Sequence, residues 1–144
     1  EHDRIQKKKS RYISFFNTLF LPEIYFKIFG YINLKRLWID SSKDEINDYI
    51  KVFKQKNALK ASLNWYRANL IKKDQRIGKI NIPTLMLSGI NDIAVGQIAV
   101  DNTELYMNGP YTLIKIDSGH WLIQESFDEV SNNIIEHIKR NKLK

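Results

Sequence analysis

Cysteine is absent from the 144 residues of this chain. Its absence excludes disulfide frameworks, thiolate nucleophiles, iron–sulfur clusters and cysteine-based zinc sites, and it is compatible with a reducing, cytoplasmic location. Long apolar runs are absent as well. No stretch approaches the roughly 18 uninterrupted apolar residues of a membrane-spanning helix, and the charged first ten residues lead into no apolar signal segment. We therefore expect a soluble, cytoplasmic protein.

Several motif classes are also missing. No spacing of histidine and carboxylate residues matches a metal site, and no helix-turn-helix, RNP or zinc-finger pattern is present. We expect no metal, no cofactor and no nucleic-acid partner. The shares of hydrophobic residues (43%) and charged residues (27%) are typical of globular proteins, and the length allows one ordinary domain or part of a larger one.

The basic charge of the chain is concentrated at its two ends. The formal net charge is +7, of which residues 1–11 and residues 135–144 each carry +3. We expect these to be solvated termini, with an anionic partner as the alternative.

Residues 12 to about 73 show helical periodicity. Ser42 and Glu45 have the spacing of a capping box, and an apolar stripe follows it. A second helix is predicted after Asn57, and Pro22 and Gly30 separate shorter helical pieces before both. The two stripes consist of Ile46, Tyr49, Ile50 and Phe53, and of Leu59, Leu63, Tyr66 and Leu70.

Residues 79–144 follow a different pattern. The short apolar run 82–89, bounded by proline and glycine, predicts a buried parallel strand. A helix over 97–107 and a second strand over 111–116 complete a strand-helix-strand crossover. Ser126 and Glu129 have capping-box spacing, and they open a closing helix. Its apolar stripe consists of Phe127, Val130, Ile134 and Ile138.

Two parallel strands offer too little surface for the helices to cover. Further strands either stand unrecognised in the helical part or belong to polypeptide outside this chain, and the helical periodicity of residues 43–70 favours the second explanation. We predict an α/β fold with three parts. They are a basic N-terminal segment (1–11), a helical region (12–78) and a strand-helix-strand-helix piece of a parallel sheet (79–144).

Reactive side chains follow both predicted strands. Asp92 lies in the loop after the first strand, and His120 lies in the loop after the second. Because the carboxyl ends of parallel strands meet at one edge of a sheet, Asp92 can accept a hydrogen bond from Nδ1 of His120. Such a pair is a general base for a nucleophile or a water molecule. The alternatives are a turn-forming aspartate and a structural histidine.

These two loops and the closing helix resemble the C-terminal half of an α/β-hydrolase. The segment Asn64-Trp65-Tyr66-Arg67 is similar to the cap-domain motif of the epoxide hydrolase branch, and residues 10–17 resemble the segment that carries a second cap tyrosine. The resemblance implies that Tyr66 and Tyr12 donate hydrogen bonds to the epoxide oxygen. It makes residues 12–78 the cap, and Trp121, which directly follows the base, a substrate-binding residue. The alternative for either tyrosine is a place in the apolar core.

The family's nucleophile elbow is missing from the sequence. Neither Gly-x-Ser-x-Gly nor its aspartate counterpart occurs among the six glycines, and the oxyanion-hole segment is missing too. We therefore expect a chain that supplies cap, acid and base to a hydrolase acting on a small organic substrate through a covalent ester. Alone it would be inactive, and its partner would be an N-terminal hydrolase half.

Other functions remain open at this point. With a serine nucleophile, the same pair would serve an esterase. Without any nucleophile, the chain would be a non-catalytic binding or assembly module from a truncated or split gene, which associates with another half or with itself. The aromatic region from Tyr12 to Trp38 lying on a membrane surface is the weakest alternative.

Overall fold

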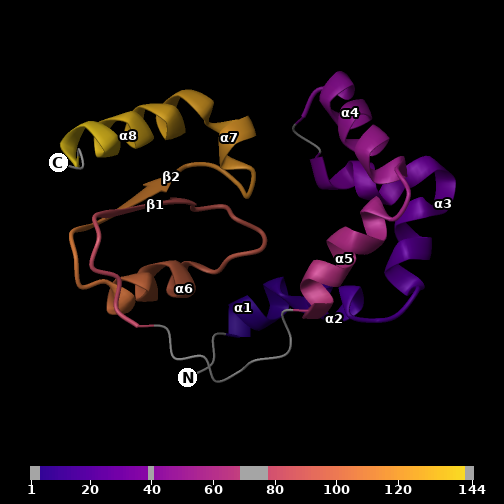
Figure 1. The fold of residues 1–144 in the computed structure, drawn as a ribbon, viewed down its shortest axis with the longest axis horizontal. Coiled ribbons are helices and arrows are strands. Elements are labelled where there is room, and N and C mark those ends of the chain that lie inside the picture. Colours follow the sequence, from indigo (N-terminus) through magenta and orange to yellow (C-terminus); the bar gives the residue numbers. More distant parts are fainter. Residues whose placement is uncertain (1–3, 39–40, 69–77, 142–144) are drawn as a thin grey trace. The chain divides into compact units, whose positions relative to one another are not determined.

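The computed structural model describes residues 4–38, 41–68 and 78–141, and Figure 1 shows its fold. The chain divides into two compact units. The first, called here the helical unit, is Arg11–Gln75. The second, the strand unit, joins Glu1–Ser10 to Arg76–Lys144, so the first ten residues group with the strands far along the chain.

The helical unit is a small bundle with its own core. Its elements are α2 (Arg11–Phe16), α3 (Leu21–Lys35), the 3₁₀ turn η1 (Arg36–Trp38), α4 (Lys43–Lys54) and α5 (Ala58–Ala68). Both predicted stripes contribute to the core, since each supplies residues that are at most 4% exposed. Leu70, predicted on the second stripe, lies outside the described residues. The buried cluster consists of Phe26, Leu34, Ile50, Leu59 and Leu63.

Local sequence signals fix the ends of these helices. The Ser42 side chain accepts from the Glu45 backbone N–H, and the Glu45 carboxylate accepts from the Ser42 N–H, so the predicted capping box is confirmed. Gly30 interrupts α3 as predicted. It lies at φ 65° between Phe29 at 51° and Tyr31 at 66°, a left-handed run that ends the first half of the helix.

The strand unit is built on two parallel strands, β1 (Thr84–Gly89) and β2 (Tyr111–Ile116). Thr84 pairs with Tyr111 and Gly89 with Ile116, so both strands end at the same edge. The predicted strands and their parallel pairing are confirmed. In Figure 1 the strands lie between α8 on one side and α6 on the other. The remaining elements are α1 (Arg4–Lys9), α6 (Gln97–Asp101), η3 (Asn102–Tyr106), α7 (Leu122–Glu125) and α8 (Phe127–Arg140).

The helix expected over 97–107 is present over 97–106, but it is α-helical only to Asp101 and 3₁₀ from Asn102 to Tyr106. One local prediction in this unit is wrong. Ser126 and Glu129 form no capping box, because α7 runs directly into α8 and the Ser126 backbone (φ −143°, ψ 46°) presents no side-chain hydrogen bond to the helix.

Large apolar side chains of the strand unit are exposed to solvent. The stripe of α8 buries Val130 at 6% exposure, but Phe127 and Ile138 are 62% and 61% exposed. Within the described ranges the sheet has two strands, which agrees with the shortage of strands inferred from the sequence. Among the same residues, no helix combines the length and apolar character that crossing a bilayer requires.

Candidate functional site at the carboxyl ends of the strands

The loops after β1 and β2 pack directly on one another. The N–H of Ile90 donates to the Ile116 carbonyl at 2.9 Å, and that of Asn91 donates to the Ser118 carbonyl at 3.0 Å. Gly89 makes this approach possible, because a Cβ at this position would lie 2.1 Å from the carbonyl oxygen of Gly119. A larger residue at the end of β1 would therefore push the two loops apart.

Asp92 and His120 meet where these loops converge. Nδ1 of His120 lies 3.0 Å from both carboxylate oxygens of Asp92. The Asp92 side chain is 10% exposed and that of His120 is 37% exposed, so the carboxylate is covered while the ring reaches solvent. The proximity expected from the strand ends is thus present in the structure.

The Asp92 carboxylate is also held by its own loop. Its Oδ1 accepts from the backbone N–H groups of Ala94 at 2.6 Å and Val95 at 2.9 Å. Burial raises the pKa of Asp92, but the hydrogen bonds from His120, Val95 and Ala94 outweigh it, so the net pKa lies below its usual value. Asp92 is accordingly an anion near neutral pH, suited to accept the Nδ1 proton of an imidazole.

A second carboxylate, that of Glu125, organises the histidine loop. Its Oε1 accepts from the backbone N–H of Trp121 at 3.0 Å, and its Oε2 accepts from the Gly119 N–H and, at 3.1 Å, from the Ser118 hydroxyl. Burial raises the pKa of Glu125, but these hydrogen bonds and the nearby His120 have a larger effect in the opposite direction, so the net pKa lies below its usual value. The carboxylate therefore fixes the backbone on both sides of His120.

The sequence alone does not mark Glu125 as a site residue. Its distance of five residues from His120 is a weak signal, since only the turn between β2 and α7 brings it back to the loop. Trp121, the predicted substrate-binding residue, is half-buried and packs edge-on against the His120 ring at 5.1 Å between centroids.

The two tyrosines predicted as hydrogen-bond donors lie together in the helical unit. The rings of Tyr12, on α2, and Tyr66, on α5, are 6.0 Å apart in an edge-to-face arrangement. Phe16 contacts both rings, at 5.3 Å and 5.0 Å. Both tyrosines are half-buried rather than fully enclosed.

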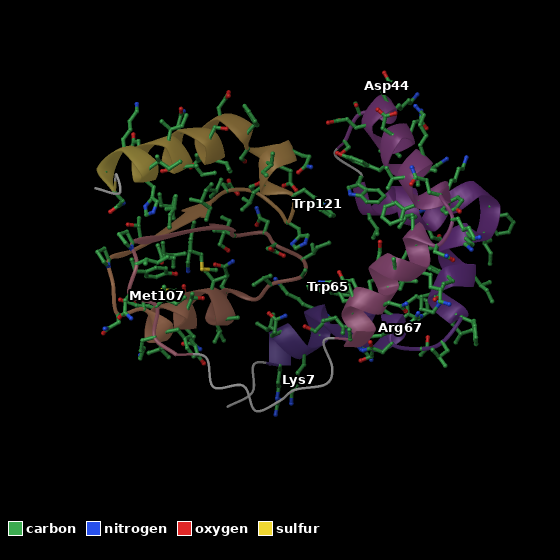
Figure 2. The ribbon with its side chains drawn as sticks, in the orientation of Figure 1. Lys7, Asp44, Trp65, Arg67, Met107 and Trp121 are labelled. Atoms are coloured by element: carbon green, nitrogen blue, oxygen red, sulfur yellow. The ribbon has the colours of Figure 1, made fainter. Side chains whose placement is uncertain are left out.

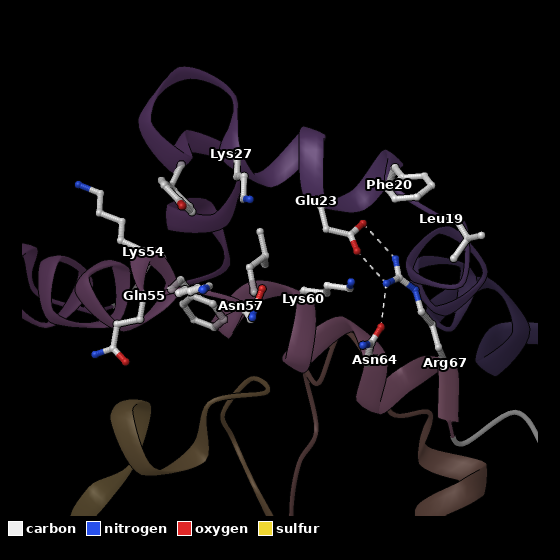
Figure 3. Close-up of a pocket in the computed structure, with 14 residues that line it drawn as sticks. Leu19, Phe20, Glu23, Lys27, Lys54, Gln55, Asn57, Lys60, Asn64 and Arg67 are labelled. Carbon is white, nitrogen blue, oxygen red and sulfur yellow. Dashed lines mark hydrogen bonds and ion pairs between the residues drawn. The ribbon is translucent and has the colours of Figure 1, made fainter.

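Arg67 has a role that the sequence did not reveal. Each of its five N–H groups is matched by an acceptor. Nη1 and Nη2 donate to the Glu23 carboxylate at 2.7 Å and 3.0 Å, and Nη1 also donates to the side-chain oxygen of Asn64. Nε donates to the Phe16 carbonyl, and Nη2 donates to the Thr18 carbonyl. Figure 2 marks Arg67 on α5, and Figure 3 shows its bonds to Glu23 and Asn64. This side chain ties α5 to the ends of α2 and α3.

A hollow of about 550 Å³ lies beside this ion pair, and Figure 3 shows the residues that line it. Neither Tyr12 nor Tyr66 lines it. Its lysines are exposed, so they are ordinary solvated cations, and the hollow lies apart from both tyrosines. The lysines are Lys27, Lys54, Lys56 and Lys60.

No group of three or more potential ligands is placed to hold a metal ion within residues 4–38, 41–68 and 78–141. The ionisable side chains at the edge of the sheet include those of Asp92 and His120. A carboxylate-bound imidazole with solvent access can remove a proton from water or from a nucleophile.

Comparison with known proteins gives a consistent set of relatives. No family model matches the chain. It is 29% identical to human epoxide hydrolase 4, in an alignment that covers 96% of this chain and 42% of the relative. It is 33% identical to epoxide hydrolase A of Mycobacterium tuberculosis, over 70% of this chain and 32% of the relative.

Solved structures show the same likeness at the level of the fold. An inhibitor complex of Bacillus megaterium epoxide hydrolase matches with a TM-score of 0.80 and 18% identity, over 95% of this chain and 54% of that one. Epoxide hydrolase A of Mycobacterium thermoresistibile matches with a TM-score of 0.72 and 18% identity, over 100% and 59%.

This chain spans less than half the length of these two curated relatives and somewhat more than half of the two solved structures. The missing strands are thus accounted for by a fold of which only a part is present. The chain has part of the α/β-hydrolase fold, and its likeness is to the epoxide hydrolase branch of that family.

Proposed function

We propose that the protein containing this chain is a hydrolase of the epoxide hydrolase type, which opens a small organic substrate through a covalent ester. The observation that carries the proposal is the Asp92–His120 pair at the carboxyl ends of β1 and β2, with its 3.0 Å contacts and its solvent-accessible imidazole. The names of the relatives support the substrate class.

The first step uses groups of the helical unit. A nucleophilic aspartate, supplied by polypeptide outside these 144 residues, attacks an epoxide carbon, and the ring C–O bond breaks. The hydroxyls of Tyr66 and Tyr12 donate to the oxygen as negative charge develops on it, which lowers the barrier. The rings of the two tyrosines lie 6.0 Å apart in the same unit, which supports a joint role. The product is an alkyl ester of the enzyme.

The second step uses the strand unit. His120, through Nε2, removes a proton from water, which then attacks the ester carbonyl. Collapse of the tetrahedral intermediate breaks the ester bond and restores the carboxylate, and the imidazolium returns its proton to the oxygen anion left by ring opening, so that a neutral diol leaves and His120 is neutral again. Asp92 holds the ring in the tautomer that leaves Nε2 unprotonated, and it stabilises the imidazolium that forms. Trp121 lines the substrate pocket beside the ring.

His120→Gln in the full-length protein tests this sequence of steps. The variant should form the alkyl-enzyme but fail to hydrolyse it, so that mass spectrometry after incubation with a simple epoxide such as styrene oxide detects a protein enlarged by the mass of the epoxide. His137→Gln, on α8, is the matched control and should turn over normally. Unlabelled protein together with undiminished turnover in His120→Gln would refute the proposal.

The 144 residues alone should not turn over an epoxide, since they lack the nucleophile motif. Catalysis by the isolated chain that is abolished by His120→Gln would contradict this expectation.

The exposed apolar stripe of α8 favours a second candidate, in which the chain is a non-catalytic assembly module. Phe127, Ile134 and Ile138 would then pack against a second copy or against a separate hydrolase half. A thermal melt of the isolated chain with a dye that binds apolar surface separates the two functions. A cooperative melt with little bound dye favours the module, and a broad transition with strong dye binding favours an incomplete hydrolase.

A further inference from the structure

The loop that carries Asp92 has little regular structure to hold it. Residues 90–96 lie between β1 and α6 and form neither strand nor helix. Backbone polar groups in such a loop need partners from elsewhere, because an unpaired group costs free energy when it is covered. Asp92 and Gly96 are both buried. Some of these backbone groups bind side chains of a segment that lies more than 80 residues earlier in the chain.

That segment is α1, which binds the loop through Gln6 and Lys9. The Gln6 amide donates from Nε2 to the Ala94 carbonyl at 2.9 Å and accepts at Oε1 from the Gly96 N–H at 2.5 Å. Lys9 donates from Nζ to the Val95 carbonyl at 3.0 Å and also to the Asp92 carbonyl. We call these two side chains the N-terminal clasp.

The spacing of the clasp follows from helix geometry. Gln6 and Lys9 are three residues apart and therefore lie on one face of α1. Lys7 and Lys8, between them, are exposed, and in Figure 2 the Lys7 side chain extends away from the ribbon. The basic N-terminal segment is thus not simply a solvated terminus. Position on the helix, rather than charge, separates the lysine that binds the loop from those that do not.

The clasp acts on the residues that also hold the Asp92 side chain. The N–H groups of Ala94 and Val95 donate to Oδ1 of Asp92, while the carbonyls of the same two residues accept from the clasp. The N–H and the carbonyl of both residues are therefore hydrogen-bonded, so the peptide groups of this turn have little freedom to rotate. A rotation of these peptide groups would disturb the N–H bonds that hold Oδ1 of Asp92 near Nδ1 of His120.

We propose that Gln6 and Lys9 are positioning residues, which hold the 92–96 turn so that the Asp92 carboxylate faces His120. They touch neither the imidazole nor the reacting groups. The structural effect stands by itself, whereas its consequence for turnover rests on the proposed function.

Gln6→Glu and Lys9→Ala in the full-length protein test the clasp without substrate. Gln6→Glu keeps the shape and the acceptor for Gly96 but removes the donor to Ala94. Each variant should speed amide hydrogen exchange at Ala94, Val95 and Gly96 by about 10-fold or more, the effect of one lost hydrogen bond, and should shift the NMR resonance of the His120 Nδ1 proton. Lys9→Arg should restore both signals, and Lys7→Ala and Lys8→Ala should leave them as in the unmodified protein.

Two results would overturn the inference. One is unchanged exchange in the 92–96 turn of both variants. The other is faster exchange with an unmoved His120 signal, which would mean that the clasp holds the turn but not the pair. Neither depends on catalysis, so this failure is distinct from that of the hydrolase proposal, which is judged by the adduct in His120→Gln. If the enzyme is active, the clasp variants should lower kcat with KM nearly unchanged.

Discussion

The guanidinium of Arg67 and the carboxylate of Glu23 form a two-point ion pair, at 2.7 Å and 3.0 Å, between α5 and the first turn of α3. Both side chains are largely covered, at 15% and 16% exposure. Because Arg67 directly follows Tyr66 and also binds the carbonyl of Phe16 at the end of α2, this pair fixes the two helices that carry Tyr12 and Tyr66.

Replacement of Arg67 with lysine should destabilise the helical unit. Lysine keeps the charge but cannot reproduce five N–H bonds in fork geometry, so we expect a loss of roughly 1–3 kcal/mol in the free energy of unfolding. Urea unfolding, followed by NMR signals from α5, measures it. Lys60→Ala, an exposed lysine of the same helix, should change it by less than about 0.5 kcal/mol. Equal stability of Arg67→Lys and the control would contradict this role.

The same pair should make the helical unit sensitive to acid. The hydrogen bond from Arg67 is the main cause that lowers the pKa of Glu23 below 4.5 in the folded state. The unfolded chain therefore binds a proton more readily, so this stabilisation is complete above pH 4.5 and is lost as the pH falls through the folded-state pKa. The urea concentration at the unfolding midpoint should fall as the pH is lowered from 7 to 3, and it should fall less steeply in Glu23→Gln than in the unmodified protein. The same dependence on pH in both proteins would disprove the linkage.

Asp92→Asn should impair catalysis without removing the fold. An amide can present its N–H to the ring, so His120 would take the wrong tautomer, and a loss of roughly 10³–10⁴-fold in kcat is expected in the full-length enzyme, as for the equivalent change in a serine protease triad. Asp117→Asn, an exposed aspartate three residues before His120, is the control. Steady-state kinetics on an epoxide would decide the matter, and comparable rates for both variants would exclude Asp92 as the partner of the base.

Glu125→Ala should loosen the His120 loop. Three donors lose their acceptor, and a small displacement of a catalytic group can cost up to about 100-fold in rate. We expect a decrease of about 10-fold or more in kcat, with partial recovery in Glu125→Gln, which keeps one acceptor oxygen. Gln124→Ala, the exposed neighbour on α7, serves as the control. Full activity of Glu125→Ala would show that the loop holds its shape unaided.

Tyr66→Phe should slow the first chemical step. The loss of one transition-state hydrogen bond corresponds to a decrease of about 10-fold or more in the rate of enzyme alkylation. Single-turnover kinetics in the His120→Gln background isolates this step, and Tyr12→Phe should act in the same direction. Phe16→Leu, which alters the packing of both rings without removing a hydroxyl, separates lost packing from lost hydrogen bonding. A normal alkylation rate in Tyr66→Phe would mean that Tyr66 is a core residue with no part in the reaction.

The sequence determined the elements and the edge at which the reactive groups lie. The stripes around Ile50 and Leu63 specify buried helix faces, because apolar spacing of three and four residues needs only local geometry. The punctuated apolar runs specify β1 and β2, and two parallel strands necessarily bring the loops of Asp92 and His120 to one edge.

Only the tertiary structure decided what holds those groups in place. Gln6 and Lys9 contact a loop more than 80 residues away, Arg67 joins helices distant in sequence, and Glu125 turns back to the loop before it. The predicted capping box at Ser126 is wrong for a related reason, since Ser126 ends α7 and precedes α8 at once, and with this backbone (φ −143°, ψ 46°) its side chain makes no cap hydrogen bond. Polar side chains bind whichever unpaired backbone group the fold brings near, and no sequence periodicity records that choice.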